Sequence, residues 1–74
     1  MANKERIIKI GKVIESLPNA TFLVELEETQ EKVICHLGGQ IRLHRIKILP
    51  GDRVKIEISP YDKKRGRIIF RENP

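Results

Sequence analysis

The carboxyl-terminal segment 59–74 combines apolar side chains with a dense group of positive charges. The charged residues are Lys63, Lys64, Arg65, Arg67 and Arg71, and they surround Ile68, Ile69 and Phe70. Because side chains alternate along a strand, Ile68 and Phe70 are predicted to face a core while Arg67 and Arg71 face outward. The two arginines would lie about 13 Å apart, four residues at about 3.3 Å each, and would contact separate phosphates of one nucleic-acid strand. The alternative is that these charges only protect a strand edge and keep the chain soluble.

A second basic segment, GGQIRLHRIK, spans residues 38–47 and is the longest stretch without strand alternation. Gly38 and Gly39 would let the backbone approach a partner closely or adopt a positive φ. Positive charge comes from Arg42, Arg45 and Lys47. The alternative interpretation is a plain connecting loop in which Ile41 and Leu43 cap the end of a barrel, and the two interpretations are compatible.

Catalytic and metal-binding chemistry finds little support in the sequence. Cys35, His36 and His44 are three possible metal ligands, but there is no second cysteine and no recognisable zinc spacing. Cys35 alternates with Val33 and Leu37, which predicts a small core residue and turns His36 outward, to solvent or to a partner. No serine has a plausible histidine-and-acid neighbourhood, and no glycine-rich phosphate loop follows a strand. We therefore expect no enzyme, no cofactor and no metal.

Charge is unevenly distributed over the 74 residues. Residues 1–31 carry four Lys/Arg and six Asp/Glu, a net of −2, and residues 32–74 carry eleven and four, a net of +7. A basic half on a small domain favours a polyanionic partner such as nucleic acid, although a solvated surface explains charge alone equally well. One cysteine permits no internal disulfide and suits a reducing compartment, and neither a signal peptide nor a membrane span is expected.

Period-two alternation dominates the chain and predicts five short strands in one domain. The side chains predicted to face inward are Phe22, Val24, Leu26, Val33, Cys35, Leu37, Val54, Ile56, Ile58, Ile68 and Phe70. The first strand, roughly 6–17, changes parity around Gly11, which suggests a bulge or bend and a strand long enough to pair on both sides. Turn residues in 17–20, 27–31, 49–52 and 60–66 separate the strands.

Five strands with one helical turn, around QIRLHR, between the third and fourth predict an all-β oligonucleotide/oligosaccharide-binding (OB) barrel. A small SH3-like barrel is the main alternative. Closing the sheet removes exposed strand edges, which matters in a chain this rich in alternating segments. The ends near 1–5 and 72–74 are expected to be flexible.

The chain has three aromatic residues, Phe22, Tyr61 and Phe70, and alternation turns both phenylalanines inward. Proteins that bind single strands usually display several aromatic rings, on which bases stack. We therefore expect binding to folded RNA through phosphates and shape. A single-stranded RNA chaperone of the cold-shock/S1 type and a protein-interaction barrel are the alternatives.

Three segments in this order and spacing resemble the bacterial and chloroplast translation initiation factor one family: ESLPNATFLVELE (15–27), IKILPGDRVKIEISPYD (46–62) and RGRIIFR (65–71). The resemblance implies an OB barrel, monomeric when free, that binds the decoding (A-site) region of the small ribosomal subunit. It would contact ribosomal RNA and a neighbouring ribosomal protein, keep elongator tRNA out, and assist initiation factors two and three. The implied location is the bacterial cytoplasm, with the chloroplast stroma as the alternative.

The family's RNA-contacting connector falls on Gly39 and Arg42, and its basic end falls on Gly66, Arg67 and Arg71. His36 matches a histidine common in the family. Departures are Gln40 and Leu43, where lysines are usual, Arg45, where an aromatic is frequent, and a longer hairpin at EETQE. Charge, strand alternation and the resemblance together predict RNA-binding residues at His36, Gly38, Gly39, Arg42, Arg45, Lys47, Tyr61, Lys63, Lys64, Arg65, Gly66, Arg67 and Arg71.

Overall fold

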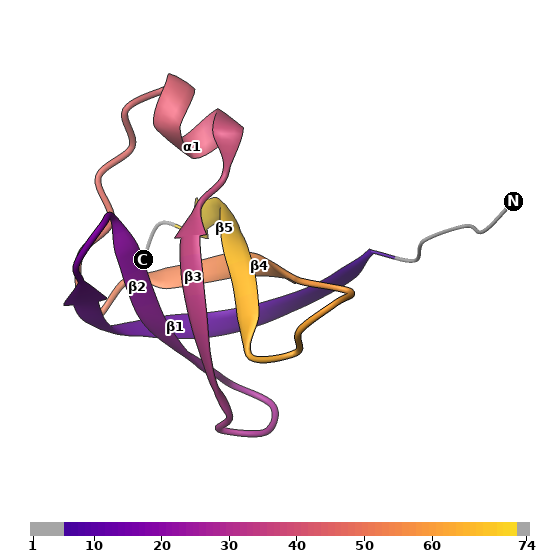
Figure 1. Ribbon diagram of the computed structural model, residues 1–74. Coiled ribbons are helices and arrows are strands. Elements are labelled where there is room, and N and C mark those ends of the chain that lie inside the picture. Colours follow the sequence, from indigo (N-terminus) through magenta and orange to yellow (C-terminus); the bar gives the residue numbers. More distant parts are fainter. Residues whose placement is uncertain (1–5, 73–74) are drawn as a thin grey trace, which may run out of the picture.

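The computed structural model describes residues 6–72 and contains five strands and one short helix (Figure 1). The elements are β1 (Ile7–Leu17), β2 (Thr21–Leu26), β3 (Lys32–Leu37), α1 (Gly39–Leu43), β4 (Arg53–Ile58) and β5 (Arg65–Glu72). No helix in this part of the chain has the length and apolar character needed to cross a membrane.

The strands form a closed barrel in the order β1-β2-β3-β5-β4, and β4 returns to β1. All neighbours are antiparallel except β3 and β5, which are parallel. β1 pairs on both sides, so that Gly11 lies opposite Leu26 of β2 and opposite Val54 of β4. The predicted five-stranded OB barrel, with one helical turn between the third and fourth strands and a long first strand, is confirmed.

The core consists of the alternate, inward-facing side chains of the barrel. Buried apolar residues are Val13, Phe22, Val24, Leu26, Val33, Cys35, Ile41, Ile48, Val54, Ile56, Ile58 and Ile68. The inward faces predicted for β2, β3 and β4 are confirmed, with Leu37 partly buried against the cluster. Regular strands of this kind bury every second residue, which is why alternation located them.

The irregularity in β1 lies at Ile14, three residues beyond the glycine at which it was expected. Val13 pairs with Val24 and Glu15 with Leu23, so Ile14 is the extra residue of a bulge and its side chain is exposed. Gly11 serves a different purpose, because a Cβ there would lie 2.5 Å from Val24 Cγ1 and 2.8 Å from the carbonyl oxygen of Glu25. Glycine therefore allows β1 and β2 to approach closely.

A second bulge in β5 overturns two predicted orientations. Ile68 pairs with Ile56 and Phe70 with Lys55, so Ile69 is the extra residue. Beyond it the alternation is reversed: Phe70 is 53% exposed, with Lys55 Nζ 5.5 Å from its ring centroid. Arg71 is half-buried, and its Nη1 donates to the carbonyl oxygen of Lys47 at 2.8 Å. The predictions that Phe70 faces the core and that Arg71 faces outward were wrong.

The expected flexible ends fall mostly outside the described residues, since 1–5 and 73–74 lie there. Glu72 is the exception, because it closes β5 and its Oε1 accepts a hydrogen bond from Arg53 Nη1 at 2.8 Å.

Candidate nucleic-acid interface

The residues predicted to bind RNA occupy three places along β3 and β5. The connector 38–47 with α1 lies at one end of the barrel, and the β4–β5 loop lies towards the opposite end (Figure 1). Between them, the parallel register of β3 and β5 sets His36 beside Arg67 and Ile34 beside Arg65. His36, Arg65 and Arg67 thus lie on the face formed by these two strands, between the connector and the β4–β5 loop.

The connector is fixed to the barrel by one apolar side chain and by backbone hydrogen bonds. Ile41 is 1% exposed and belongs to the core cluster. After α1 the chain turns at Arg45, which has a φ of 54° and whose N–H donates to the carbonyl oxygen of Arg42 at 3.1 Å. Ile41 therefore caps the barrel as expected. Leu43 does not, because it is 72% exposed.

Three cations of the connector are exposed and have no counter-ion among the described residues. Arg42, Arg45 and Lys47 belong to the ten-residue connector, and none has an ion pair within residues 6–72. A positive charge that is solvated and uncompensated is available to phosphate without first breaking a contact. The connector is therefore one part of the predicted surface that is ready to bind a polyanion.

Two of the three predicted glycines are explained by packing within the chain. A Cβ on Gly38 would lie 2.7 Å from the carbonyl oxygen of Ile68, and one on Gly66 would lie 2.7 Å from that of Glu57. Gly38 has a φ of −70°, so a positive φ is not the reason for glycine there. Gly39 differs, because a Cβ there meets nothing within 4 Å, and close approach of a partner to Gly39 stays a prediction.

A groove of about 440 Å³ runs along the outer surface of β3, β4 and β5. It brings together four of the predicted residues, His36, Arg65, Gly66 and Arg67. It also contains residues that were not predicted, namely Thr21, Ile34, Glu57, Ile58, Ser59 and Pro60. The outward parity of Ile34 was available from alternation, but the parallel pairing of β3 with β5, which creates the groove, was not.

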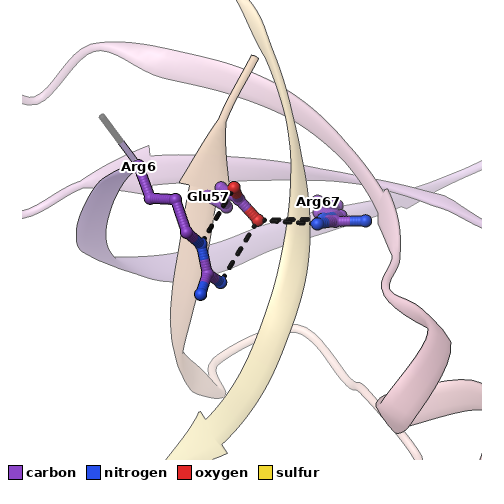
Figure 2. A network of polar contacts seen from close by, with 3 residues as sticks. All are labelled: Arg6, Glu57 and Arg67. Carbon is purple, nitrogen blue, oxygen red and sulfur yellow. Dashed lines mark hydrogen bonds and ion pairs between the residues drawn. The ribbon is translucent and has the colours of Figure 1, made fainter. Parts of the chain in front are cut away.

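Arg67 faces outward as predicted, yet its charge is already engaged (Figure 2). Its Nε and Nη2 donate to Glu57 Oε1 at 3.0 and 2.8 Å. Arg6 holds the same carboxylate, with Nε donating to Oε2 at 3.2 Å and Nη2 to Oε1 at 3.4 Å. Hydrogen bonds from Arg67 and then from Arg6 hold the pKa of Glu57 below its usual range.

The expected ladder of two outward arginines is therefore not present in the free protein. Arg67 is paired with Glu57, and the bulge at Ile69 turns Arg71 towards the carbonyl oxygen of Lys47. A regular strand would have left both guanidinium groups facing solvent on the same side. A phosphate that takes Nε and Nη2 of Arg67 displaces its carboxylate, whereas the connector cations need no such change.

The β4–β5 loop is shaped by its own side chains. Ser59 Oγ accepts the backbone N–H groups of Tyr61 at 3.1 Å and Asp62 at 3.3 Å, and Asp62 Oδ1 accepts that of Lys64 at 3.0 Å. Asp62 also lies 3.6 Å from Arg65 Nε, so the charge of Arg65 is partly compensated. Lys63 and Lys64 are exposed without an ion pair in the described part of the chain.

Two aromatic rings are exposed where one was expected. Tyr61 is 82% exposed in the β4–β5 loop, and Phe70 is exposed near the end of β5. Five residues at about 3.3 Å separate the start of β5 from Phe70, so the two rings lie at opposite ends of that strand and form no continuous stacking surface. Each is a separate place where one base or one apolar side chain would fit.

Cys35 is a structural residue, as alternation predicted. Its side chain is fully buried, and burial raises the pKa of its thiol to about 12. A thiol held neutral in this way is a poor nucleophile. Within residues 6–72, no group of three or more His, Cys, Asp and Glu side chains is arranged to hold a metal ion.

Comparison with known proteins agrees with this geometry. The whole chain, residues 1–74, matches the family described as "Translation initiation factor 1A / IF-1". The fold is similar to the solution structure of translation initiation factor one from the Wolbachia endosymbiont strain TRS of Brugia malayi, with a TM-score of 0.76 and 41% identity over 92% of this chain and 79% of that one. It is also similar to the crystal structure of YjeQ from Thermotoga maritima, with a TM-score of 0.73 and 34% identity over 90% of this chain but 23% of that protein.

Proposed function

Because the chain belongs to the translation initiation factor 1A / IF-1 family, we propose that it binds the small ribosomal subunit at the decoding (A-site) region. It contacts ribosomal RNA and a neighbouring ribosomal protein there, and its barrel blocks access of elongator tRNA. It assists initiation factors two and three from this position. It is monomeric when free and acts without catalysis, in the cytoplasm of a bacterium or, alternatively, in a chloroplast stroma.

The observation that carries this proposal is the uncompensated charge of the connector. Arg42, Arg45 and Lys47 are exposed on one short segment that Ile41 anchors to the core. Guanidinium groups bind phosphate oxygens through paired donors, and neutralising each phosphate releases condensed counter-ions. Three such contacts give a salt dependence with a slope of about −2 to −3 in a plot of log K against log salt.

A single-stranded RNA chaperone is the second candidate, and the exposure of Tyr61 and Phe70 favours it. Base stacking on exposed rings is tolerant of sequence and of RNA structure. The two rings lie far apart, however, and each would hold a single base, which is a weak basis for tracking an extended strand.

Sedimentation with purified small ribosomal subunits tests the proposal and separates the two candidates. We expect saturable binding of one chain per subunit, much tighter than binding to an unstructured RNA oligonucleotide, with the salt slope given above. Equal affinity for the oligonucleotide would support the chaperone instead. No association with either RNA would contradict both and leave a protein-interaction barrel.

A further inference from the structure

Glu57 is an acidic residue in the middle of a surface otherwise suited to a polyanion. It belongs to β4 and lies between Arg6, which precedes β1, and Arg67 of β5 (Figure 2). Its side chain is 17% exposed, against 49% for Arg67 and 63% for Arg6. Two guanidinium groups thus share one carboxylate, so the trio carries a net charge of +1.

The carboxylate uses the same donors that a phosphate would use. Arg67 gives both Nε and Nη2 to one oxygen of Glu57, at 3.0 and 2.8 Å. A guanidinium group binds carboxylate and phosphate oxygens with the same planar arrangement of donors. Glu57 and Arg67 both line the groove that holds His36 and Arg65, so a phosphate there would compete with the carboxylate for Arg67.

We propose that Glu57 is an internal competitor that RNA phosphate must displace from Arg67 when the chain binds its site. This inference rests on the proposed function, because it requires RNA along β3 and β5. A phosphate that takes Nε and Nη2 of Arg67 displaces Glu57 from those donors. A folded RNA that holds a phosphate in place offsets this loss with a bidentate contact, whereas unstructured RNA must also order its backbone. Glu57 therefore lowers the affinity for both kinds of RNA, and the folded site keeps tight binding through its other contacts.

Arg6 makes the exchange feasible. A carboxylate that is largely buried and loses its only partner is destabilising, because its lost hydration is not replaced. Arg6 donates to both oxygens of Glu57, at 3.2 and 3.4 Å, and those contacts do not involve Arg67. When Arg67 turns to phosphate, Arg6 keeps the carboxylate paired. The three residues thus have two arrangements, with Arg67 on the carboxylate or on the RNA.

The test is a double-mutant cycle on small-subunit binding with the parent chain, Glu57→Gln, Arg67→Gln and the combined variant. We expect Glu57→Gln to tighten binding by about twofold to fivefold, the range set by releasing a partly exposed ion pair. In the Arg67→Gln background the same change should have little effect, because no guanidinium is left to release. For an unstructured oligonucleotide, the gain from Glu57→Gln should be at least as large.

Two further variants distinguish the loss of the Glu57–Arg67 contact from the loss of one negative charge. Glu27→Gln removes one negative charge and the contact with Arg53, whose Nε lies 2.6 Å from Glu27 Oε2; Arg53 keeps its ion pair with Glu72, and Arg67 is not touched. Glu57→Asp keeps the charge but withdraws the carboxylate from Arg67, and it should also tighten binding. Thermal melts confirm that each variant is folded.

Equal gains from Glu27→Gln and Glu57→Gln, or a gain that is the same with and without Arg67, would overturn the inference while the proposed function stood. If the parent chain does not bind the subunit at all, the proposed function and this inference both fall.

Discussion

Replacing Ile68 with alanine is expected to lower the free energy of unfolding by about 2–5 kcal/mol, whereas Phe70→Ala lowers it by about 1 kcal/mol or less. Ile68 is fully buried between β3 and β4, opposite Leu37 and Ile56, so its removal leaves a cavity. Phe70 is two residues away in sequence, but the bulge at Ile69 places its ring on the outer surface against Lys55. Truncating it removes one surface contact and creates no cavity.

Urea unfolding of the two variants and the parent chain measures this difference. A barrel of this size has about 5–10 kcal/mol of stability to lose, so Ile68→Ala should be visibly less cooperative or partly unfolded at 37 °C. Equal losses from the two variants would mean that β5 has no bulge and that Phe70 faces the core after all.

The second large effect is expected from the connector. Changing Arg42 to Gln together with Arg45 to Asn should weaken small-subunit binding by about 30- to 60-fold at 0.1 M salt and make the salt slope shallower by about 1.4–1.8. Both figures follow from losing two phosphate contacts. Asparagine is chosen at position 45 because Arg45 has a φ of 54°, a conformation that asparagine tolerates well. The fold should be unchanged.

Lys12→Gln with Lys32→Gln is the matched control for the connector variant. Both lysines are exposed, and neither has an ion pair within residues 6–72, so the same amount of positive charge is removed elsewhere on the barrel. An equal loss of affinity in the control would show that net charge, and not the connector, decides binding.

Alternation predicted most of the barrel because β2, β3 and β4 are regular strands with one buried face. It failed where a strand holds an extra residue. Ile68, Ile69 and Phe70 are three consecutive apolar residues, and a strict period of two has no place for the middle one. That run signalled a bulge, but whether Ile69 or a neighbour was the extra residue depended on how β5 pairs with β4, which sequence spacing does not reveal.

For a similar reason, the sequence predicted the exposed charges of the candidate site but not the contacts between its strands. The connector charges Arg42, Arg45 and Lys47 follow directly from composition, and they are exposed and uncompensated within the described residues. Glu57 was overlooked, because its contact with Arg67 joins residues from neighbouring strands and requires their register. Gly38 and Gly66 were assigned to RNA although backbone crowding within the barrel accounts for both. Contacts that depend on strand pairing cannot be predicted from one sequence, because the register of the strands is not known.

The connector is proposed to lie against decoding-region RNA, and directed cleavage is the most direct test of that placement. Cys35 is fully buried and the pKa of its thiol is raised to about 12, so a single Leu43→Cys substitution offers the reactive thiol. Leu43 is 72% exposed beside Arg42, and an iron chelate attached there generates hydroxyl radicals next to the proposed RNA contact. Thr29, exposed in the β2–β3 loop at the other end of the barrel, is the control position for the chelate.

With the Leu43→Cys variant bound to small subunits, we expect strand breaks in the ribosomal RNA of the decoding region, stronger than those from Thr29→Cys. Breaks confined to other parts of the subunit, or none above the background of unattached chelate, would contradict the account.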